Sequence, residues 1–402
     1  MGILGKRFKL ISLHGNIGKL SIIAFLITIS LALIDTIWAV YLESFLQNEA
    51  YVGFFSGMLT FISFFSFFLI IPLIEKRKKE ALVSFGLIVL IVSYILFSFV
   101  KSFLFISLIA IAAIIALNIK VSSFGIIVRD KSKRNKLSRN EGILYTVYNL
   151  GWVIGPLIAG YIASKFGFSF VFLTASLILL FSLIVLNYFK ISDHKVKKRV
   201  DSNLFRNFIE FFSNKERLVA YFLGGGANFW WVLIYLFMPL YLNDKGIGID
   251  KISIFLFVVL IPNVLFSYFF AVKASKIGFK KVFIVGYLIL ALTTFFCFFI
   301  ENIFIIVALL VLATVGISMI EPTTEAYFLD LMKGNEAYHF YAPYNTTIDV
   351  NSFIAKIVPS LFLLFLPFKF VFLVFSIFML GFVILSLFSK NIIESRRRRD
   401  WY

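Results

Sequence analysis

The chain has 402 residues, of which 61% are hydrophobic and only 15% are charged. A soluble domain is nearer half apolar and a quarter charged, so this composition excludes a water-soluble enzyme and a disordered chain. The single cysteine, Cys297, and three scattered histidines argue against a disulfide framework and against a metal or haem cluster. A net charge of +18 would suggest nucleic-acid binding in a soluble protein, whereas in a membrane protein it reports cytoplasmic loops.

Apolar runs long enough to cross a bilayer recur along the whole chain, since a spanning helix needs about 20 such residues. The runs are continuous rather than alternating, so they predict helices and not the strands of a membrane barrel. The first run is also too long for a signal peptide. The sequence therefore predicts an all-α membrane protein with twelve transmembrane helices, at residues 20–46, 51–74, 81–100, 103–127, 142–163, 168–189, 218–243, 252–272, 282–300, 303–329, 340–366 and 368–389.

Lysine and arginine are distributed unequally between the two sides of these spans. One side, which includes both termini, holds 32 of the 39 residues. The loops of the other side hold Lys101, Lys165, Lys245, Lys251 and Lys369. Because cytoplasmic loops retain positive charge, both termini are expected in the cytoplasm, in a multi-pass protein of the plasma membrane. The same distribution accounts for the net charge without nucleic acid, and the Arg396–Arg399 run is interpreted as a membrane-surface or topology signal.

The longest loop, at roughly 190–217, separates the first six spans from the last six. Within it, apolar side chains recur at helical spacing with charged residues mostly opposite; they are Leu204, Phe205, Phe208, Ile209 and Phe212. An amphipathic helix on the inner leaflet is therefore expected. The predicted organisation is an N-terminal six-helix bundle at 1–190, a cytoplasmic linker at 191–217 and a C-terminal six-helix bundle at 218–402.

The two halves echo each other at an offset near 200 residues. The matching positions are Glu75–Lys79 with Ser275–Lys281 after spans two and eight, Asp130 with Asp330 after spans four and ten, and Pro156 with Pro359 in spans five and eleven. Each match is weak alone, but together they recur in the same order on equivalent helices. Repeated halves around a midplane site are typical of secondary transporters.

The chain resembles the major facilitator superfamily of transporters over essentially its whole length. The family's signature between spans two and three is Gly-x-x-x-Asp-Arg-x-Gly-Arg-Arg-Lys. The second half of the chain resembles it through Ala271, Ser275, Lys276, Gly278, Lys280 and Lys281. The first half does so only in part, through Glu75, Lys76, Lys78 and Lys79, with Ile71 in place of the leading glycine. The resemblance implies two pseudo-symmetric six-helix bundles and a cytoplasmic gate that includes Glu75, Lys76, Lys276, Gly278 and Lys280.

A second motif lies in span five, where Gly151, Gly155, Pro156 and Gly160 form the pattern Gly-x-x-x-Gly-Pro-x-x-x-Gly. It resembles the Gly-x-x-x-Gly-Pro-x-x-Gly-Gly pattern of the family's drug:proton antiporters, with Ala159 replacing the first closing glycine. Small residues let helices approach closely, and a proline bends its helix. The motif therefore has two interpretations, namely ordinary helix packing or an antiporter that exports its substrate.

Ionisable side chains inside hydrocarbon are costly, so each is a functional hypothesis. The family resemblance implies that spans one, four, seven and ten line a central cavity. Asp35 lies in the middle of span one, and Trp38, three residues on, shares its face. We interpret Asp35 as a proton carrier or a cation anchor. The alternative is a carboxylate that is hydrogen-bonded to neighbouring helices.

Span ten carries Glu321, followed by Pro322, and then Glu325 one turn later. Two like charges in a poor dielectric disfavour joint ionisation, so the pair can retain one proton. Glu325 lies close to the cytoplasmic end, where solvation is the alternative. Lys120 on span four is the near pseudo-symmetric counterpart of Glu321, which suggests an ion pair between them when the cytoplasmic side is closed. The alternative for Lys120 is snorkelling to the inner headgroups.

Two further stripes carry polar residues into the spans. Asp349 shares one stripe of span eleven with Asn345, Ser352 and Lys356, at a depth similar to that of Glu321. Asn228, Trp231 and Tyr235 share one stripe of span seven. Aromatic and amide side chains together suit a pocket for an amphipathic or cationic ligand. Core packing is the alternative for Asn228, Trp231 and Tyr235. Asp349 could join the network of Glu321, or Lys356 could neutralise it.

These features predict a secondary transporter that moves a small solute by alternating access, and not an enzyme. The leading hypothesis is proton-coupled efflux of amphipathic or cationic compounds. The alternatives are an uptake permease, working by symport or uniport, for a sugar, amino acid or other metabolite, and a polytopic lipid-handling membrane protein. The chain lacks a Gly-x-x-x-x-Gly-Lys-Ser/Thr loop, which argues against ATP-driven transport. The expected partners are the solute, protons and the lipid bilayer, with no cofactor, metal or nucleic acid, and a monomer is expected.

Overall fold

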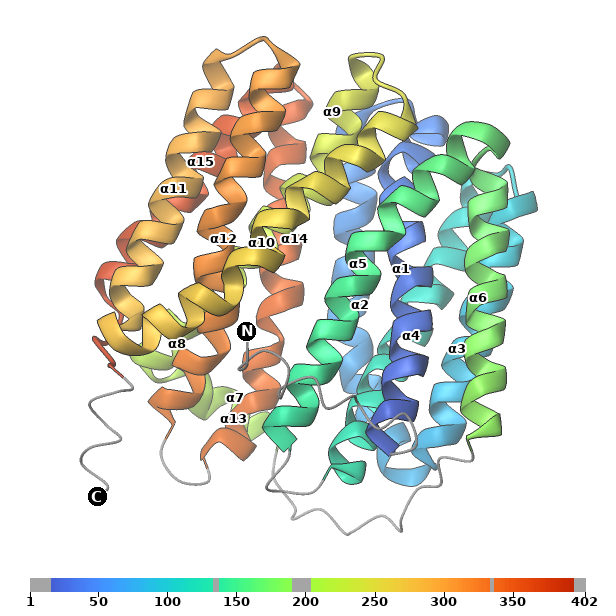
Figure 1. Ribbon diagram of the computed structural model, residues 1–402, viewed down its shortest axis with the longest axis horizontal. Coiled ribbons are helices and arrows are strands. Elements are labelled where there is room, and N and C mark those ends of the chain that lie inside the picture. Colours follow the sequence, from blue (N-terminus) through green and yellow to red (C-terminus); the bar gives the residue numbers. More distant parts are fainter. Residues whose placement is uncertain (1–15, 133–136, 190–203, 333–335, 394–402) are drawn as a thin grey trace, which may run out of the picture. The chain divides into compact units, whose positions relative to one another are not determined.

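The computed structural model describes residues 16–132, 137–189, 204–332 and 336–393 (Figure 1). Within these ranges the regular elements are all helical, and eleven helical segments are long and apolar enough to cross a membrane. The predicted all-α membrane fold is therefore confirmed. The elements are α1 (Asn16–Leu46), α2 (Glu49–Lys76), α3 (Lys79–Phe99), α4 (Phe103–Lys131), α5 (Leu137–Phe166), α6 (Phe168–Tyr188), α7 (Leu204–Phe212), α8 (Lys215–Val232), η2 (Leu233–Phe237), α9 (Met238–Asp244), α10 (Ile249–Ile277), α11 (Phe279–Phe299), α12 (Ile303–Leu331), α13 (Glu336–Asn345), α14 (Thr347–Leu363) and α15 (Lys369–Leu387).

The chain forms two compact units. The first comprises Met1–Ile37 and Phe65–Lys197, and the second comprises Trp38–Phe64 and Lys198–Tyr402. The end of α1 and the first half of α2 thus belong to the second unit, and the predicted division into two six-helix bundles stays a prediction. The physical reason for this assignment of α2 is a close approach between α2 and α14, described below, which draws residues of the two sequence halves together.

The offset of 200 residues is visible in the helix boundaries. α2, α3 and α4 begin at residues 49, 79 and 103, and α10, α11 and α12 begin at 249, 279 and 303. α3 and α11 are both 21 residues long, and α4 and α12 are both 29. Within their own units, α3 packs against α4 and α6 as α11 packs against α12 and α15 (Figure 1). The repeat seen in the sequence is therefore a repeat of structure.

The eleventh predicted span, 340–366, is not one helix but the pair α13 and α14, which meet at Thr346. Pro343 lies three residues before the break, and its carbonyl oxygen accepts both the Thr346 backbone N–H (3.3 Å) and the Thr346 hydroxyl (2.7 Å). The Tyr221 side chain of α8 also reaches the Thr346 hydroxyl, at 3.1 Å. A local turn that is stabilised by side chains thus replaces the continuous helix that hydropathy predicted.

The seventh predicted span, 218–243, is also irregular. It consists of α8, the π-helical turn η2 and α9, which follow one another without interruption. Pro239 opens α9 and has no N–H to donate to the carbonyl four residues before it, Tyr235. A wider turn at this point is the physical response, and π-turns inside helices occur frequently at functional sites.

The predicted linker helix is present as α7, but its buried side differs from the predicted stripe. Ile209 and Phe212 are exposed, and the side chains of Leu204 and Phe205 lie outside the described residues. Phe211, which was not part of the stripe, is completely buried. Its ring lies about 6 Å from the rings of Tyr221 on α8, Phe328 on α12 and Phe340 on α13. Contact of α7 with the inner leaflet stays a prediction.

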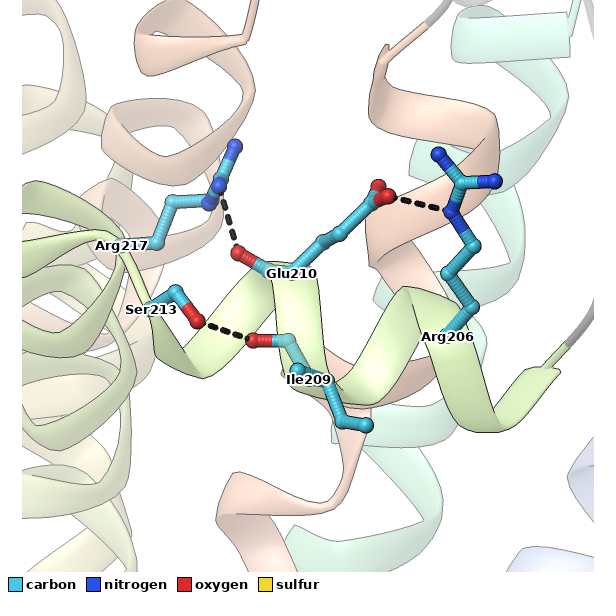
Figure 2. Close-up of polar contacts among 5 residues, drawn as sticks. All are labelled: Arg206, Ile209, Glu210, Ser213 and Arg217. Atoms are coloured by element: carbon cyan, nitrogen blue, oxygen red, sulfur yellow. Dashed lines mark hydrogen bonds and ion pairs between the residues drawn. The ribbon is translucent and has the colours of Figure 1, made fainter.

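Polar contacts of α7 run along the helix and cap its C-terminal end (Figure 2). Arg206 Nε donates to Glu210 Oε1 at 2.6 Å, one turn along the helix. At the C-terminal end, Arg217 Nη2 donates to the Glu210 carbonyl oxygen at 2.7 Å, and Ser213 Oγ donates to the Ile209 carbonyl oxygen at 2.7 Å. The terminal carbonyls of a helix lack intrahelical donors, so these side chains act as its C-terminal cap.

Candidate functional site

Glu321 lies where α12 meets α8 and α10 in the second unit. Its Oε2 accepts a hydrogen bond from Asn263 Nδ2 of α10 at 2.8 Å, and its Oε1 accepts one from Trp231 Nε1 of α8 at 3.3 Å. The Asn263 side chain is buried, and the Glu321 and Trp231 side chains are half-buried. Both carboxylate oxygens are therefore engaged by N–H donors, an arrangement that suits a charged carboxylate.

Each of the three helical segments carries a proline or a π-helical turn next to this carboxylate. Pro322 follows Glu321 inside α12, and Pro262 precedes Asn263 inside α10. On the α8 side, η2 begins two residues after Trp231. A proline inside a helix removes a backbone donor and loosens the helix locally. The site thus lies beside two prolines and a π-helical turn, each of which removes or displaces a backbone hydrogen bond of its helix.

The predicted stripe of span seven lies beside this carboxylate. Asn228, Trp231 and Tyr235 are half-buried, whereas the residues between them are buried. The Trp231 and Tyr235 rings lie 6.0 Å apart at an angle of 49°. The structure therefore brings Trp231 into contact with Glu321, and the ring of Tyr235 lies next to that of Trp231. Asn263 was missed in the sequence, although an amide after a proline within an apolar run was a usable signal.

Glu325, one turn beyond Glu321, has a different environment. Its side chain is exposed, and its Oε1 accepts a hydrogen bond from Tyr341 Oη of α13 at 2.7 Å. The two glutamates predicted to share a proton thus have separate hydrogen-bond partners. Their joint protonation stays a prediction.

Asp349 and Lys356 of α14 face α2. Asp349 Oδ1 accepts from Ser63 Oγ at 2.9 Å, and Lys356 Nζ donates to Thr60 Oγ1 at 2.7 Å. Asp349 and Lys356 also attract each other electrostatically across two turns of α14. Asp349 was predicted to join Glu321 or to be neutralised by Lys356. The structure shows its contacts with α2 and the attraction to Lys356.

Two glycines of α2 permit this contact. A Cβ atom at Gly53 would overlap Ser360 Oγ, and one at Gly57 would lie 2.5 Å from Ile357 Cδ1. Gly53, Gly57, Thr60 and Ser63 follow one another along the face that meets α14. Small residues at this spacing let two helices approach closely, so that short hydroxyl side chains can reach the charged groups opposite.

The predicted residues of the first unit have separate contacts, both with α3. Asp35 is exposed in the middle of α1, and its charge interacts with Tyr94, a buried residue of α3. Lys120 is buried on α4, where its Cβ packs against Gly86 of α3. In the part of the chain that the structure describes, no hydrogen bond or ion pair reaches the Lys120 amino group. An ion pair between Lys120 and Glu321 would join the two units and stays a prediction.

Trp38 lies on α1 beyond the first unit. It is half-buried, and its ring lies 6.1 Å from that of Tyr41, one turn along the helix. A role of Trp38 in a substrate cavity stays a prediction.

The span-five motif packs against α1. Cβ atoms at Gly151 and Gly155 would meet Thr28 and Ala32, respectively, while Pro156 and Gly160 are buried. Close packing of α5 on α1 therefore accounts for the first two glycines. The export function that the motif suggested does not follow from this geometry.

The predicted gate motif of the second half forms the turn between α10 and α11. Gly278 has a φ of +95°, a value that other residues rarely adopt. Lys280 Nζ donates to the Leu387 carbonyl oxygen at the end of α15, whereas Lys276 is exposed. In the first half Lys76 is exposed, and the Glu75 side chain lies outside the described residues. The glycine and Lys280 thus have a structural role within the second unit.

Comparison with known proteins gives the family. The sequence pattern described as "Major Facilitator Superfamily" matches residues 20–261 and 231–400. No curated protein matches the chain. The chain belongs to the major facilitator superfamily, a class of membrane transporters and not of enzymes.

Solved structures share the fold at low sequence identity. The nucleoside transporter NupG matches with a TM-score of 0.75 and 13% identity, over 92% of this chain and 98% of the other. A D-xylose-proton symporter matches with a TM-score of 0.74 and 12% identity, over 93% and 98%. A POT family transporter, solved in complex with a thioalcohol-conjugated peptide, matches with a TM-score of 0.77 and 12% identity, over 92% and 95%. These likenesses concern the fold alone.

Proposed function

We propose that this transporter is a proton-coupled exporter of amphipathic or cationic organic compounds, with Glu321 as its coupling carboxylate. The observation that carries the proposal is the environment of Glu321, a half-buried carboxylate inside a spanning helix that is held by Trp231 and Asn263. An acidic group at this depth is costly unless it has a function. The aromatic faces of Trp231 and Tyr235 beside it suit a cation, since aromatic rings attract positive charge.

In the proposed cycle, proton and substrate compete for Glu321. A proton bound from outside neutralises the carboxylate, and its release inward restores the charge that attracts the next cation. Exchange at one carboxylate links the proton flux to the substrate flux without ATP. The two halves rock against each other, so that the site opens to one side of the membrane at a time. Asp35 serves as a second proton carrier or cation anchor. Lys120 and Asp349 take part in the charge balance that accompanies the conformational change.

The second candidate is uptake of a polar solute by symport or uniport. Two observations favour it. The span-five glycines have a packing role against α1 that does not require an export function. A D-xylose-proton symporter and a nucleoside transporter are among the proteins of the same fold. In this candidate Glu321 carries the co-transported proton, and Trp231 stacks on the solute.

Transport by the purified protein in proteoliposomes tests both candidates. An exporter of the proposed kind exchanges tetraphenylphosphonium for protons, so an acidic lumen drives the cation inward against its gradient. A symporter instead accumulates radiolabelled xylose or uridine when the outside is acidic. Glu321→Gln, which keeps the shape and removes the charge, is expected to abolish pH-driven accumulation in either case. Full proton-driven transport by this variant would contradict the role of Glu321.

We further propose a monomer in the plasma membrane, with both termini in the cytoplasm. The distribution of Lys and Arg supports this orientation. The partners in this proposal are the organic solute, protons and the surrounding bilayer, without a cofactor, a metal or nucleic acid.

A further inference from the structure

A hydrogen-bonded pair of residues stands behind Glu321 on α10. Asn263 donates through Nδ2 to Glu321 Oε2 at 2.8 Å, and its own Oδ1 accepts from Ser267 Oγ at 2.8 Å. The same Ser267 hydroxyl also donates to the Asn263 backbone carbonyl oxygen at 2.5 Å, one turn back along α10, so its one proton is shared between two acceptors. Asn263 is only 6% exposed. Neither residue is charged, and neither belongs to a motif of the sequence.

The orientation of the Asn263 amide decides what Glu321 meets. An amide has a donor end and an acceptor end, and rotation by half a turn exchanges them. The Ser267 hydroxyl shares its proton between the Asn263 backbone carbonyl oxygen and this acceptor end, and the second of these hydrogen bonds favours the orientation with the NH₂ group toward the carboxylate. In the rotated amide, Oδ1 would face Glu321, and two acceptors would repel each other. The serine thus holds the amide in the orientation that favours a charged carboxylate.

Protonation of Glu321 weakens this arrangement. A charged carboxylate accepts hydrogen bonds with both oxygens, and such charge-assisted bonds are stronger than neutral ones. Once one oxygen carries a proton it becomes a donor, so it no longer accepts as well from Asn263 or Trp231. Both partners therefore favour the charged form, and proton binding has to overcome their hydrogen bonds.

Within the described residues, charged side chains of the surrounding helices do not reach the Glu321 carboxylate, whose polar partners are Asn263 and Trp231. On α11, the titratable Tyr287 donates its hydroxyl to the Leu223 carbonyl oxygen. On α12, Glu325 is bound by Tyr341. On the α8 side, Tyr235 follows Trp231 by one turn. The charged residues of α8 and α11 lie in the first turn of each helix, and those of α10 lie within five residues of one of its ends. Asn263 and Trp231 are therefore the side chains whose hydrogen bonds act on the proton affinity of Glu321, in opposition to its burial.

We propose that Asn263 and Ser267 are positioning residues which hold Glu321 in its charged form and set the pH at which it binds a proton. The proposal rests on the proposed function insofar as this proton is the one that drives transport. Trp231 makes the event observable without any substrate, because its indole N–H donates to the same carboxylate.

The test is a pH titration of the tryptophan fluorescence of the purified full-length protein, with the proton as the probe. The Trp231 signal is the difference between the wild type and Trp231→Phe. It is expected to titrate in the wild type and to be constant in Glu321→Gln. Asn263→Leu removes the donor, and Asn263→Asp adds a like charge, so both are expected to move the midpoint to higher pH by about one unit or more.

Ser267 supplies the sharper comparison because its substitutions are small. Ser267→Ala frees the amide to rotate and is expected to shift the midpoint in the same direction by a smaller amount. Ser267→Thr keeps the hydroxyl and is expected to titrate like the wild type. A merely structural role would lower thermal stability in both variants without moving the midpoint. In a Glu321→Gln background, none of the α10 variants should change the signal further.

The outcomes separate this inference from the proposed function. Unchanged midpoints in Asn263→Leu and Ser267→Ala, or a wild type whose Trp231 signal does not titrate, would overturn the positioning role while leaving a transport role for Glu321 in place. Conversely, Glu321→Gln could lose the titration and still perform proton-driven transport in proteoliposomes. That result would contradict the proposed function, and with it the role of this proton in transport. The positioning of Glu321 by Asn263 and Ser267 would stand.

Discussion

At the scale of single residues, the polar groups inside the spans divide into two kinds. Glu321 and Asp349 were identifiable from the sequence, because any carboxylate inside an apolar run is costly and therefore conspicuous. Ser63 and Thr60 were not, since neutral side chains are common in spans and gain meaning only from a partner on another helix. Asn263 was missed as well, although its place after Pro262 was a usable signal. Sequence reasoning thus locates the charges, whereas the structure supplies the groups that bind them.

Trp231 offers a residue-scale prediction. Trp231→Phe keeps an aromatic ring beside Tyr235 but removes the N–H that donates to Glu321 Oε1. Loss of one such hydrogen bond, worth about 0.5–1.5 kcal/mol, is expected to lower the affinity for an organic cation about two- to tenfold. Trp231→Ala also removes the aromatic face and should cost more. Equilibrium binding of tetraphenylphosphonium measures the series, and equal affinities for the two variants would show that the ring makes no contribution.

At the scale of helices, hydropathy predicted where the elements lie but not how they are broken. The runs at 218–243 and 340–366 are apolar throughout, so a count of apolar residues cannot detect the π-turn η2 or the turn at Thr346. Pro239 and Pro343 marked both places in the sequence. A proline inside a run is compatible with a kink as well as a break, and contacts such as that of Tyr221 with Thr346 decide between them.

The contact between α2 and α14 gives an element-scale prediction. Gly53→Ala brings a methyl group onto Ser360 Oγ, which is itself held by the Lys356 carbonyl oxygen, so the two helices must separate or strain. Overpacking of this kind costs about 1–3 kcal/mol and should lower the thermal unfolding temperature. Gly125→Ala on α4, where nothing lies within 4 Å of an added Cβ, is the matched control.

A double substitution tests the cause of that effect. Gly53→Ala combined with Ser360→Gly removes the atom that the new methyl group meets, so stability is expected to return most of the way to that of Ser360→Gly alone. If the double variant is as unstable as the sum of the single ones, the loss does not come from this contact.

The linker helix gives a second prediction at this scale. Phe211→Ala empties the space between Tyr221, Phe328 and Phe340, and truncation of a buried phenylalanine costs about 3–5 kcal/mol. Because α7 has no other completely buried aromatic side chain among its described residues, its detachment is expected to precede global unfolding. Limited proteolysis should then cut near α7 faster than in the wild type. Ile209→Ala, at an exposed position of the same helix, should leave the rate unchanged.

At the scale of the whole molecule, the repeat of 200 residues has a consequence for orientation. α3 and α11 begin and end 200 residues apart, as do α4 and α12, so the turns at 100–102 and 300–302 are equivalent. Repeats that each contain six spans enter the membrane in the same direction. The two turns should therefore lie on one side of the membrane, and the Lys-rich turns after α2 and α10 should lie on the other.

Single cysteines test this arrangement, because the native Cys297 is completely buried and gives a low labelling background. Ser102→Cys and Asn302→Cys, both at exposed positions, are expected to react with a membrane-impermeant maleimide added to intact cells. Lys78→Cys and Lys276→Cys, which are also exposed, should react in inverted vesicles and not in intact cells. Labelling of Ser102→Cys and Asn302→Cys from opposite sides would refute the parallel repeat. Labelling of all four from the reverse sides would keep the repeat and refute the cytoplasmic termini, because the charge argument and the repeat argument are independent.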